Sequence, residues 1–409
     1  MKKIEHDGVE LDGVHALTAG QASVRAGRRR ESCGVSSLRL IGAACGLGAP
    51  GTRCAEAPGQ LRTRLASSPS LRGQIVWHRM VAARATLDRQ RFPPRGLGPF
   101  CRRLAKAVDD CVAADARFIV LGGDHSCAIG TWNGARGGLR RRGPLGLVWI
   151  DAHMDAHTWQ TSPSGRTHGM PLASLLGVGD PGLAFFGRKS RICLLPQHIC
   201  LVGVRSFEAE EEALLKKLGV RIYLMEEVRR YGLAAIMTEA VLQVGSETAG
   251  FGVSIDLDAV DPGDAPAVAM PEPGGIRSDD LLAALRIASR SPRFIGMEIA
   301  EFNPLRDRDK RTAELIERMV ETVAEVPHST SVLELERRYL ARNYEPLPVV
   351  LTRGKGVYVW DAAGRRYLDL MSAYSAVSFG HAHPRLVRAL AAQARRLSMV
   401  SRAYHTDRL

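Results

Sequence analysis

Residues 145–155 read LGLVWIDAHMD, an apolar run that ends in three side chains able to bind a metal ion, Asp151, His153 and Asp155. A short, uninterrupted apolar run of this kind is typical of a strand that is buried on both faces of a parallel sheet. Two more motifs have the same form. GGDHS at 122–126 follows the run FIVL at 118–121, and SIDLD at 254–258 follows FGV at 251–253. Each motif therefore places polar side chains at the end of a predicted strand.

The three motifs together supply two imidazoles and four carboxylates: His125, His153, Asp151, Asp155, Asp256 and Asp258. In open parallel sheets ligands bind at the carboxyl ends of the strands, so we expect these side chains to converge there. Carboxylate-rich sites with few imidazoles suit harder ions such as manganese. Two divalent cations about 3.5–4 Å apart can share one water and lower its pKa from ~15.7 towards neutrality. The alternative is that the acids are helix caps and the histidines satisfied polar groups, which explains one motif as well but three poorly.

From Leu38 onward, apolar strand-like runs alternate with longer helix-like segments. Further strands are predicted at 192–195, 200–203, 220–224 and 294–299, and helices at 208–218 and 278–288. Such alternation predicts an α/β fold built on a doubly wound parallel sheet.

The motifs GGDHS, DAHMDAH and SIDLDAVDP resemble the metal-binding motifs of the ureohydrolase family, which includes the arginases and agmatinases. Two further matches favour arginase: SPSGRTHGMP at 162–171 resembles a loop with serine contacts and a histidine, and EFNP at 301–304 resembles a late Glu-x-Asn-Pro motif. The resemblance runs from about Leu38 to about Val326. It implies a three-layer α/β subunit that assembles into homo-trimers or hexamers.

The resemblance also implies two Mn²⁺ ions per subunit. One would be held by His125, Asp151, Asp155 and Asp256, and the other by Asp151, His153, Asp256 and Asp258. A hydroxide shared by the ions would attack the guanidinium carbon of L-arginine, giving L-ornithine and urea. Asp155 would receive the hydroxide proton, and His168 would shuttle protons, which suits an imidazole pKa near ~6.5. Glu301 would pair with the guanidinium group of the substrate.

Substrate contacts depart from the usual arginase pattern. Ser164 would contact the substrate carboxylate and Glu208, in place of an aspartate, would face the α-amino group. His157 and Arg166 stand where asparagines are common, and Ala269-Met270 replaces Gly-Thr. Arg166 could grip a carboxylate more firmly than an amide does, and would repel the ammonium group of agmatine. Another guanidino compound, of the agmatinase or guanidinobutyrase type, therefore stays open as the substrate.

After about Pro327 the sequence changes character. RGKGVYVWD at 353–361, YLDLMSAYSAV at 367–377 and GHAHP at 380–384 resemble the amino-terminal segment of ornithine aminotransferase. The Gly-Lys-Gly stretch fits a hairpin turn, and His381 and His383 are predicted to be turn residues rather than ligands. By this resemblance the lysine that binds the cofactor lies beyond Leu409, so no pyridoxal phosphate and no transaminase activity are expected. Cut from its fold, such a tail cannot bury its apolar side chains, and we expect it to be disordered or prone to aggregate.

Three regions are expected: a basic, poorly ordered extension at 1–36, an arginase-like metallohydrolase domain at 37–327, and an incomplete aminotransferase-like tail at 328–409. The tail leaves open that the chain is a non-catalytic fragment of a bifunctional arginase/ornithine aminotransferase, with an ornithine aminotransferase chain as a candidate partner.

Composition narrows the class of protein. The chain has 409 residues and a net charge of +13, but its arginines are scattered and not interleaved with aromatic residues, which argues against a nucleic-acid partner. Eight cysteines without C-x-x-C spacing favour a reduced, cytoplasmic protein. The absence of an 18-residue apolar run argues against a membrane span.

Overall fold

The computed structural model describes residues 15–17, 38–51, 53–84, 94, 96–180, 193–325, 347, 349–361, 364–397 and 405. Contacts divide the chain into two compact units. The larger unit is Cys33–Ser331, and the smaller unit combines Met1–Ser32 with Val332–Leu409.

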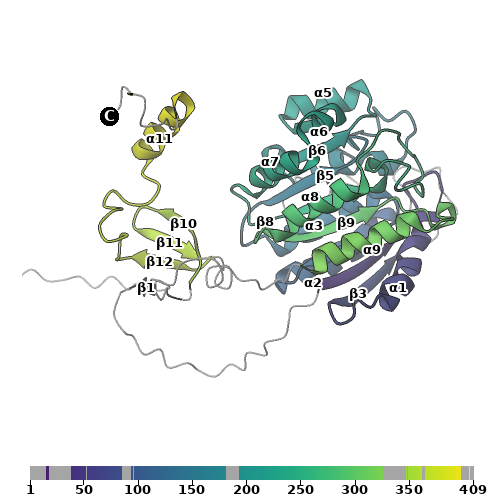
Figure 1. Ribbon diagram of the computed structural model, residues 1–409, viewed down its shortest axis with the longest axis horizontal. Coiled ribbons are helices and arrows are strands. Elements are labelled where there is room, and N and C mark those ends of the chain that lie inside the picture. Colours follow the sequence, from purple (N-terminus) through teal and green to yellow (C-terminus); the bar gives the residue numbers. More distant parts are fainter. Residues whose placement is uncertain are drawn as a thin grey trace, which may run out of the picture. The chain divides into compact units, whose positions relative to one another are not determined.

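The larger unit is built on an eight-stranded sheet in which every neighbouring pair of strands is parallel. Its order is β3-β2-β4-β9-β8-β5-β6-β7 (Figure 1). The strands are β2 (Leu38–Ala44), β3 (Ile75–Ala82), β4 (Phe118–Leu121), β5 (Leu145–Ile150), β6 (Ile199–Val204), β7 (Arg221–Leu224), β8 (Gly250–Asp256) and β9 (Phe294–Ala300). The predicted α/β class with a doubly wound parallel sheet is confirmed.

Both faces of this sheet are covered, and this explains the uninterrupted apolar runs. In β5, Val148 and Ile150 pack into one core while Leu147 and Trp149 pack into the other. Side chains alternate across a strand, so burial on both faces requires apolar residues at successive positions.

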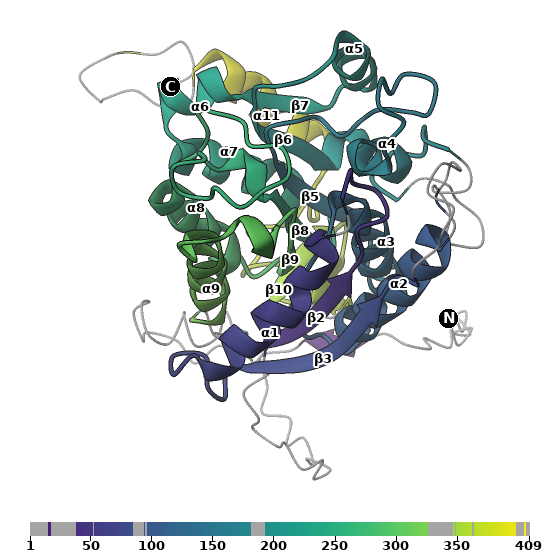
Figure 2. The same cartoon turned by 90° about the vertical axis from the view of Figure 1, so that its right-hand side faces the viewer.

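Helices form the two outer layers of the three-layer unit. The first core contains residues of α1 (Ala57–Ser67), α6 (Met225–Tyr231), α7 (Leu233–Gly245), α8 (Ser278–Arg290) and α9 (Arg311–Ala324). The second contains residues of α2 (Leu97–Ala113), α3 (Ala128–Gly138), α4 (Pro171–Leu175) and α5 (Ala209–Leu218). Figure 2 shows α1, α8 and α9 on one side of the sheet and α2 and α3 on the other.

Most of the predicted elements are present, and one strand is wrong. The helices predicted at 208–218 and 278–288 are α5 and α8, and β6, β7 and β9 cover three of the four further predicted strands. Ile192 lies outside the described residues, and the rest of the segment 192–195 is not a strand. The amide groups of Cys193 and Leu194 both donate to the carbonyl of Leu175 at the end of α4. These amides therefore bond to the carbonyl at the end of a helix instead of pairing with a neighbouring strand.

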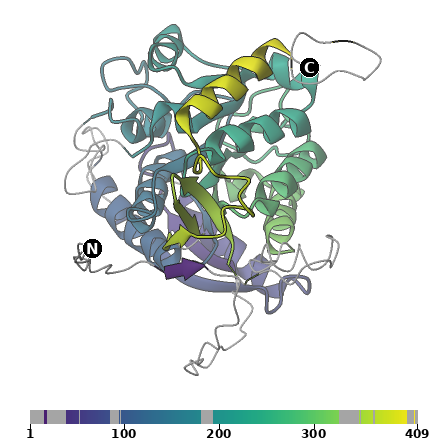
Figure 3. The ribbon, with the colours of Figure 1, turned by 90° about the vertical axis from the view of Figure 1, so that its left-hand side faces the viewer.

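The smaller unit contains a four-stranded sheet of order β1-β12-β11-β10 (Figure 3). Its strands are β1 (His15–Leu17), β10 (Leu351–Lys355), β11 (Tyr358–Asp361) and β12 (Arg366–Asp369). The predicted hairpin is confirmed, because β10 pairs antiparallel with β11. Sequence reasoning missed β1, a segment of the amino-terminal extension that pairs in parallel with β12.

The described part of the tail contains regular strands and a helix, contrary to the expected disorder. It buries Val359 and Tyr367 but leaves many of its other apolar residues exposed. Helix α11 (Pro384–Arg396) buries none of its side chains, and Leu390 and Phe379 are about three-quarters exposed.

The predicted turn at His381 is wrong, because His381 forms an isolated antiparallel β-bridge with Gly356 and the turn lies at Ala382. His381 Nε2 lies 2.7 Å from Asp369 Oδ2. Among the described residues, no helix has the length and apolar character that crossing a membrane requires.

Replacing Gly252 with alanine should destabilise the larger unit. A Cβ atom at Gly252 on β8 would overlap the fully buried ring of Trp132. Overpacking of this kind costs about 1–3 kcal/mol, which urea unfolding followed by circular dichroism would measure. The matched control is Gly59→Ala at an exposed position of α1, where nothing lies within 4 Å and a gain of about 0.5–1 kcal/mol is expected. Wild-type stability in Gly252→Ala would contradict the packing of Trp132 against β8.

Candidate active site

The six predicted ligands lie at the carboxyl ends of three strands, β4, β8 and β5, and Glu301 follows the end of β9, which separates β4 from β8 in the sheet. His125 follows β4, the residues Asp151, His153 and Asp155 follow β5, and Asp256 and Asp258 lie at and just after the end of β8. The structure therefore brings together the side chains that the sequence motifs singled out.

The first ligand group surrounds His125 at the bottom of the site. Its Nδ1 lies 2.9 Å from Asp155 Oδ2, 3.1 Å from Asp256 Oδ2 and 3.3 Å from Asp151 Oδ2. All four residues are buried, and their ligand atoms lie within 4.8 Å of one another. The His125 ring stacks on Trp149, with ring centroids 4.4 Å apart.

The second ligand group surrounds His153 and is more open to solvent. Its Nδ1 lies 3.1 Å from Asp258 Oδ2 and 3.6 Å from Asp151 Oδ1. Asp151 belongs to both groups, one oxygen facing each. Asp256 belongs to the first group alone, so its expected contact with a second ion stays a prediction.

Backbone and indole donors orient the shared carboxylate. The amide of His153 donates to Asp151 Oδ1 at 2.7 Å, and Trp149 Nε1 donates to Asp151 Oδ2 at 2.9 Å. The amide of Asp258 likewise donates to Asp256 Oδ1 at 3.0 Å. Because these oxygens are fixed from the protein side, their remaining lone pairs are directed into the site.

Two buried atoms of the first group support a metal ion as its occupant. His125 Nδ1 and Asp155 Oδ2 are 2.9 Å apart, but neither has a hydrogen-bond partner. Buried polar atoms without a partner are rare and costly. A cation among one imidazole and three carboxylates would satisfy both atoms, and this donor set suits a hard divalent ion.

Several side chains of the site keep their protons up to a higher pH than they would in water. Burial and then Coulomb repulsion from Asp151 raise the pKa of Asp258 to about 6, and burial with repulsion from Asp258 raises the pKa of Asp256. Burial alone would lower the pKa of His125, but the nearby carboxylates of Asp151, Asp155 and Asp256 raise it well above its usual value. A metal ion must displace these protons, so its binding is linked to pH.

Glu301 and His168 form a pair beside the first ligand group. Glu301 Oε1 lies 3.2 Å from His168 Nδ1 and accepts the His125 amide at 3.0 Å, whereas Oε2 is buried without a partner. Burial opposes the charged form of His168, but the hydrogen bond and the charge of Glu301 raise its pKa to about 9. The expected pKa near ~6.5 is therefore wrong for this arrangement.

The predicted substrate contacts fall into two places. His157 Nε2 lies 3.0 Å from Glu208 Oε2 and 3.4 Å from Glu211 Oε2, so these three residues form one cluster. Arg166 and Ser164 lie in an exposed loop, where the Arg166 amide donates to Ser164 Oγ at 3.3 Å.

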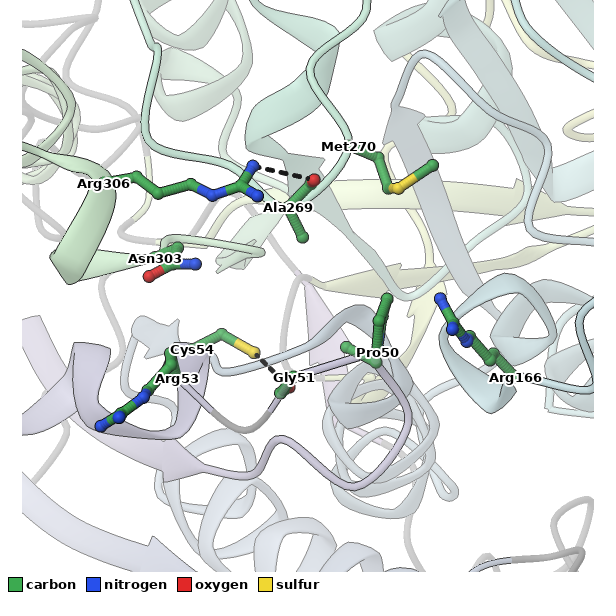
Figure 4. Close-up of a pocket in the computed structure, with 10 residues that line it drawn as sticks. Pro50, Gly51, Arg53, Cys54, Arg166, Ala269, Met270, Asn303 and Arg306 are labelled. Carbon is green, nitrogen blue, oxygen red and sulfur yellow. Dashed lines mark hydrogen bonds between the residues drawn. The ribbon is translucent and has the colours of Figure 1, made fainter. Parts of the chain in front are cut away.

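Arg166 also lines a cavity of about 370 Å³. Figure 4 shows Arg166 and Arg306 on opposite sides of this cavity, with Met270 and Ala269 along one edge and Pro50 and Gly51 along the other. Arg306 is committed to the backbone, because it donates to the carbonyls of Val268 and Ala269. Among the described residues, no hydrogen bond of the Arg166 guanidinium to a backbone carbonyl is found. Arg166 is therefore better placed than Arg306 to bind an anionic group.

Sequence reasoning missed three residues of the site region: Glu211, Ser254 and Glu298. Glu211 forms a capping box with Glu208, and the spacing Glu208-x-x-Glu211 before a helix is a readable signal for it. Glu298 lies within the otherwise apolar strand FIGMEIA, and a carboxylate inside a buried strand is itself a signal of a polar partner.

Comparisons with known proteins identify relatives that are similar in sequence and in fold. The arginase family model matches residues 36–325, and the class-III aminotransferase model matches residues 339–409. The arginase of Bacillus caldovelox is 41% identical over 211 residues, which cover 52% of this chain and 69% of the relative. The arginase of Brevibacillus brevis is 36% identical over 221 residues, 54% of this chain and 73% of the relative. The solved structure of the Bacillus caldovelox arginase has a TM-score of 0.65 at 31% identity, and the match covers 71% of this chain and 98% of that chain.

Divalent-cation affinity should fall as the pH is lowered, and more steeply below about 6, where protonation of Asp258 adds to that of His125. Asp258, whose pKa is raised to about 6 by burial and by Asp151, is free of its proton above that pH and protonated below it. Each displaced proton should weaken binding about tenfold per pH unit below its pKa. Titration calorimetry with Mn²⁺ between pH 5 and pH 8 would measure this, and affinity independent of pH would contradict the assignment.

Replacing Asp258 with asparagine should weaken metal binding and abolish hydrolysis. The amide keeps the shape but removes the charge that faces His153 Nδ1 at 3.1 Å. Bound manganese, counted after dialysis, should drop below the wild-type value. Asp279→Asn, at an exposed position on α8, is the matched control and should retain both metal and activity. An Asp258→Asn protein with the wild-type rate would refute the second ligand group.

Proposed function

Since this chain belongs to the arginase family, we propose that it is a manganese-dependent hydrolase that converts L-arginine to L-ornithine and urea. The observation that carries the proposal is the pair of ligand groups that share Asp151 beside Glu301, whose Oε2 is buried without a partner.

Two Mn²⁺ ions are the proposed metals, which His125, His153 and the four aspartates would hold, and Asp151 and Asp256 are proposed as ligands of both. Carboxylates outnumber imidazoles and no thiol is among them, which favours manganese over zinc. When bound, the ions would supply the activated water that attacks the guanidinium carbon.

Glu301 is proposed to orient the substrate. Its Oε1 is already engaged by the His125 amide and by His168, so the unpartnered Oε2 is the oxygen left to accept a guanidinium N–H. A left-handed backbone, with φ of 66°, directs this side chain, and Asp155 has the same feature with φ of 50°. Such strained backbone is costly and clusters at functional sites.

Proton transfer is assigned to His168 and Asp155. His168 holds its proton at neutral pH, because Glu301 raises its pKa to about 9 despite burial. It is thus suited to donate a proton to the amine that leaves as ornithine, whereas the carboxylate of Asp155 is suited to accept one.

The amino-acid end of the substrate is proposed to lie towards the open side of the site, where the loop of Ser164 and Arg166 and the cluster of His157, Glu208 and Glu211 are expected to contact it. Arg166 and Ser164 would hold the carboxylate, and Glu208 with His157 would hold the α-ammonium group. Arg166 and the half-exposed Met270 line one cavity, and this favours a substrate that carries a carboxylate. A guanidino acid of another chain length, of the guanidinobutyrase type, is the second candidate, and agmatine fits less well because it lacks that carboxylate.

The tail is proposed to be an inactive segment related to ornithine aminotransferase. Its matched segment, 339–409, contains one lysine, Lys355, which is exposed at the end of β10. The chemistry of such an enzyme depends on a lysine that binds the cofactor, and neither that role nor a bound pyridoxal phosphate is proposed for Lys355. The proposed boundaries are 1–36, 37–327 and 328–409.

We further propose a cytoplasmic homo-oligomer, a trimer or hexamer, with an ornithine aminotransferase chain as a candidate partner. All seven cysteines among the described residues are buried free thiols, which suits a reducing compartment. The rival proposal of a non-catalytic fragment is disfavoured, because both ligand groups are formed.

Urea release from the full chain with added Mn²⁺ should be fast with L-arginine, slower with guanidinobutyrate and slowest with agmatine. The reason is that Arg166 attracts a carboxylate and repels an ammonium group. Arg166→Gln should raise KM for arginine more than it lowers kcat, and should narrow the gap between arginine and agmatine. A preference for agmatine in the wild-type chain would overturn the substrate assignment. Bound manganese without urea release from any guanidine would favour the non-catalytic fragment.

A further inference from the structure

A carboxylate lies buried within the sheet, below the candidate metal centre. Glu298 is in the middle of β9 and is fully buried. In the register of the sheet it is paired with Val120 of β4 on one side and Ser254 of β8 on the other, and Ser254 is paired with Trp149 of β5. The ends of this row, Val120 and Trp149, belong to the apolar core, so an acid within it is expensive unless it is bonded.

Three donors satisfy the Glu298 carboxylate. Thr131 Oγ1 donates to Oε1 at 2.7 Å and Cys127 Sγ to the same oxygen at 3.1 Å. Ser254 Oγ donates to Oε2 at 3.0 Å. Ser254 Oγ also lies 3.1 Å from His125 Nε2, within hydrogen-bond distance. A continuous chain of hydrogen bonds therefore leads from Glu298 through Ser254 to the imidazole of His125.

The direction of this chain follows from counting protons. A hydroxyl has one proton, and Ser254 Oγ uses it to donate a hydrogen bond to Glu298 Oε2. The hydroxyl oxygen can then only accept, so His125 must carry its proton on Nε2. This places the lone pair on Nδ1, the atom that lies within 3.3 Å of Asp151, Asp155 and Asp256.

We propose that Glu298 is a positioning residue that acts through Ser254 to fix the tautomer and orientation of His125 for metal binding. The inference rests on the proposed metal centre, but it concerns residues that touch neither metal nor substrate. Partners of this kind orient imidazole ligands, and their loss typically weakens metal affinity about 10–100-fold.

The test compares two variants that each remove one donor from Glu298. Ser254→Ala removes the donor to Oε2 and breaks the chain to His125. Thr131→Val has nearly the same shape as the residue it replaces, removes the donor to Oε1, and leaves the chain to His125 intact. Mn²⁺ affinity is measured on the full chain by titration calorimetry, and thermal unfolding of the metal-free proteins measures the cost to the fold.

Ser254→Ala should bind Mn²⁺ about 10–100-fold more weakly than Thr131→Val, and a higher Mn²⁺ concentration should restore its urea release without a change in KM for arginine. Glu298→Gln, which keeps the volume but removes the charge, should also bind more weakly, and it serves as the second variant. Equal affinity in Ser254→Ala and Thr131→Val, or a rate that added manganese does not restore, would overturn the inference. A wild-type chain that binds Mn²⁺ but releases no urea would refute the proposed reaction and leave this comparison of affinities valid.

Discussion

The concentration of like charge at one edge of the sheet is the constraint on which the rest of the structure depends. Four aspartates converge within two overlapping groups, and those of the first group are almost completely buried with His125. Buried carboxylates this close repel one another, and burial together with this repulsion raises the pKa values of Asp256 and Asp258. Protons can relieve the repulsion in part, but divalent cations relieve it while using the orphaned atoms His125 Nδ1 and Asp155 Oδ2.

Holding such a site requires a rigid frame, and the larger unit supplies it in several ways. The parallel sheet brings strand ends from distant parts of the chain to one edge. Gly123 allows the loop after β4 to lie directly against the carbonyl of Cys45, where any Cβ atom would overlap. Asp155 and Glu301 accept left-handed backbone that non-glycine residues rarely adopt. These costs fall at the positions proposed to do chemistry, in a unit whose two apolar cores can support them.

The loops at the mouth of the site are exposed to solvent, whereas the first ligand group at its base is buried. Backbone amides and Trp149 fix Asp151 and Asp256, and the chain that leads to Glu298 fixes His125. The mouth is made of loops, with Ser164 and Arg166 exposed and Met270 half exposed. Departures from the usual arginase residues include the exposed Arg166 and the buried His157. The buried first ligand group and the exposed loop of Ser164 and Arg166 therefore differ in how strongly the fold constrains them.

The sequence by itself determined the fold class and the six candidate ligands, because both are encoded locally: each motif is an apolar run followed at once by polar residues. It also predicted α5, α8 and the hairpin of β10 and β11, whose signals are short-range. It failed where distant segments decide the outcome. Residues 193–195 form no strand, and the amides of Cys193 and Leu194 donate to the carbonyl of Leu175 instead. Strand β1 exists through its pairing with β12. The raised pKa of His168 depends on Glu301, and the chain from Glu298 to His125 depends on the register of β8 and β9. Only the tertiary structure could decide these points, because each is a contact between residues far apart in the chain.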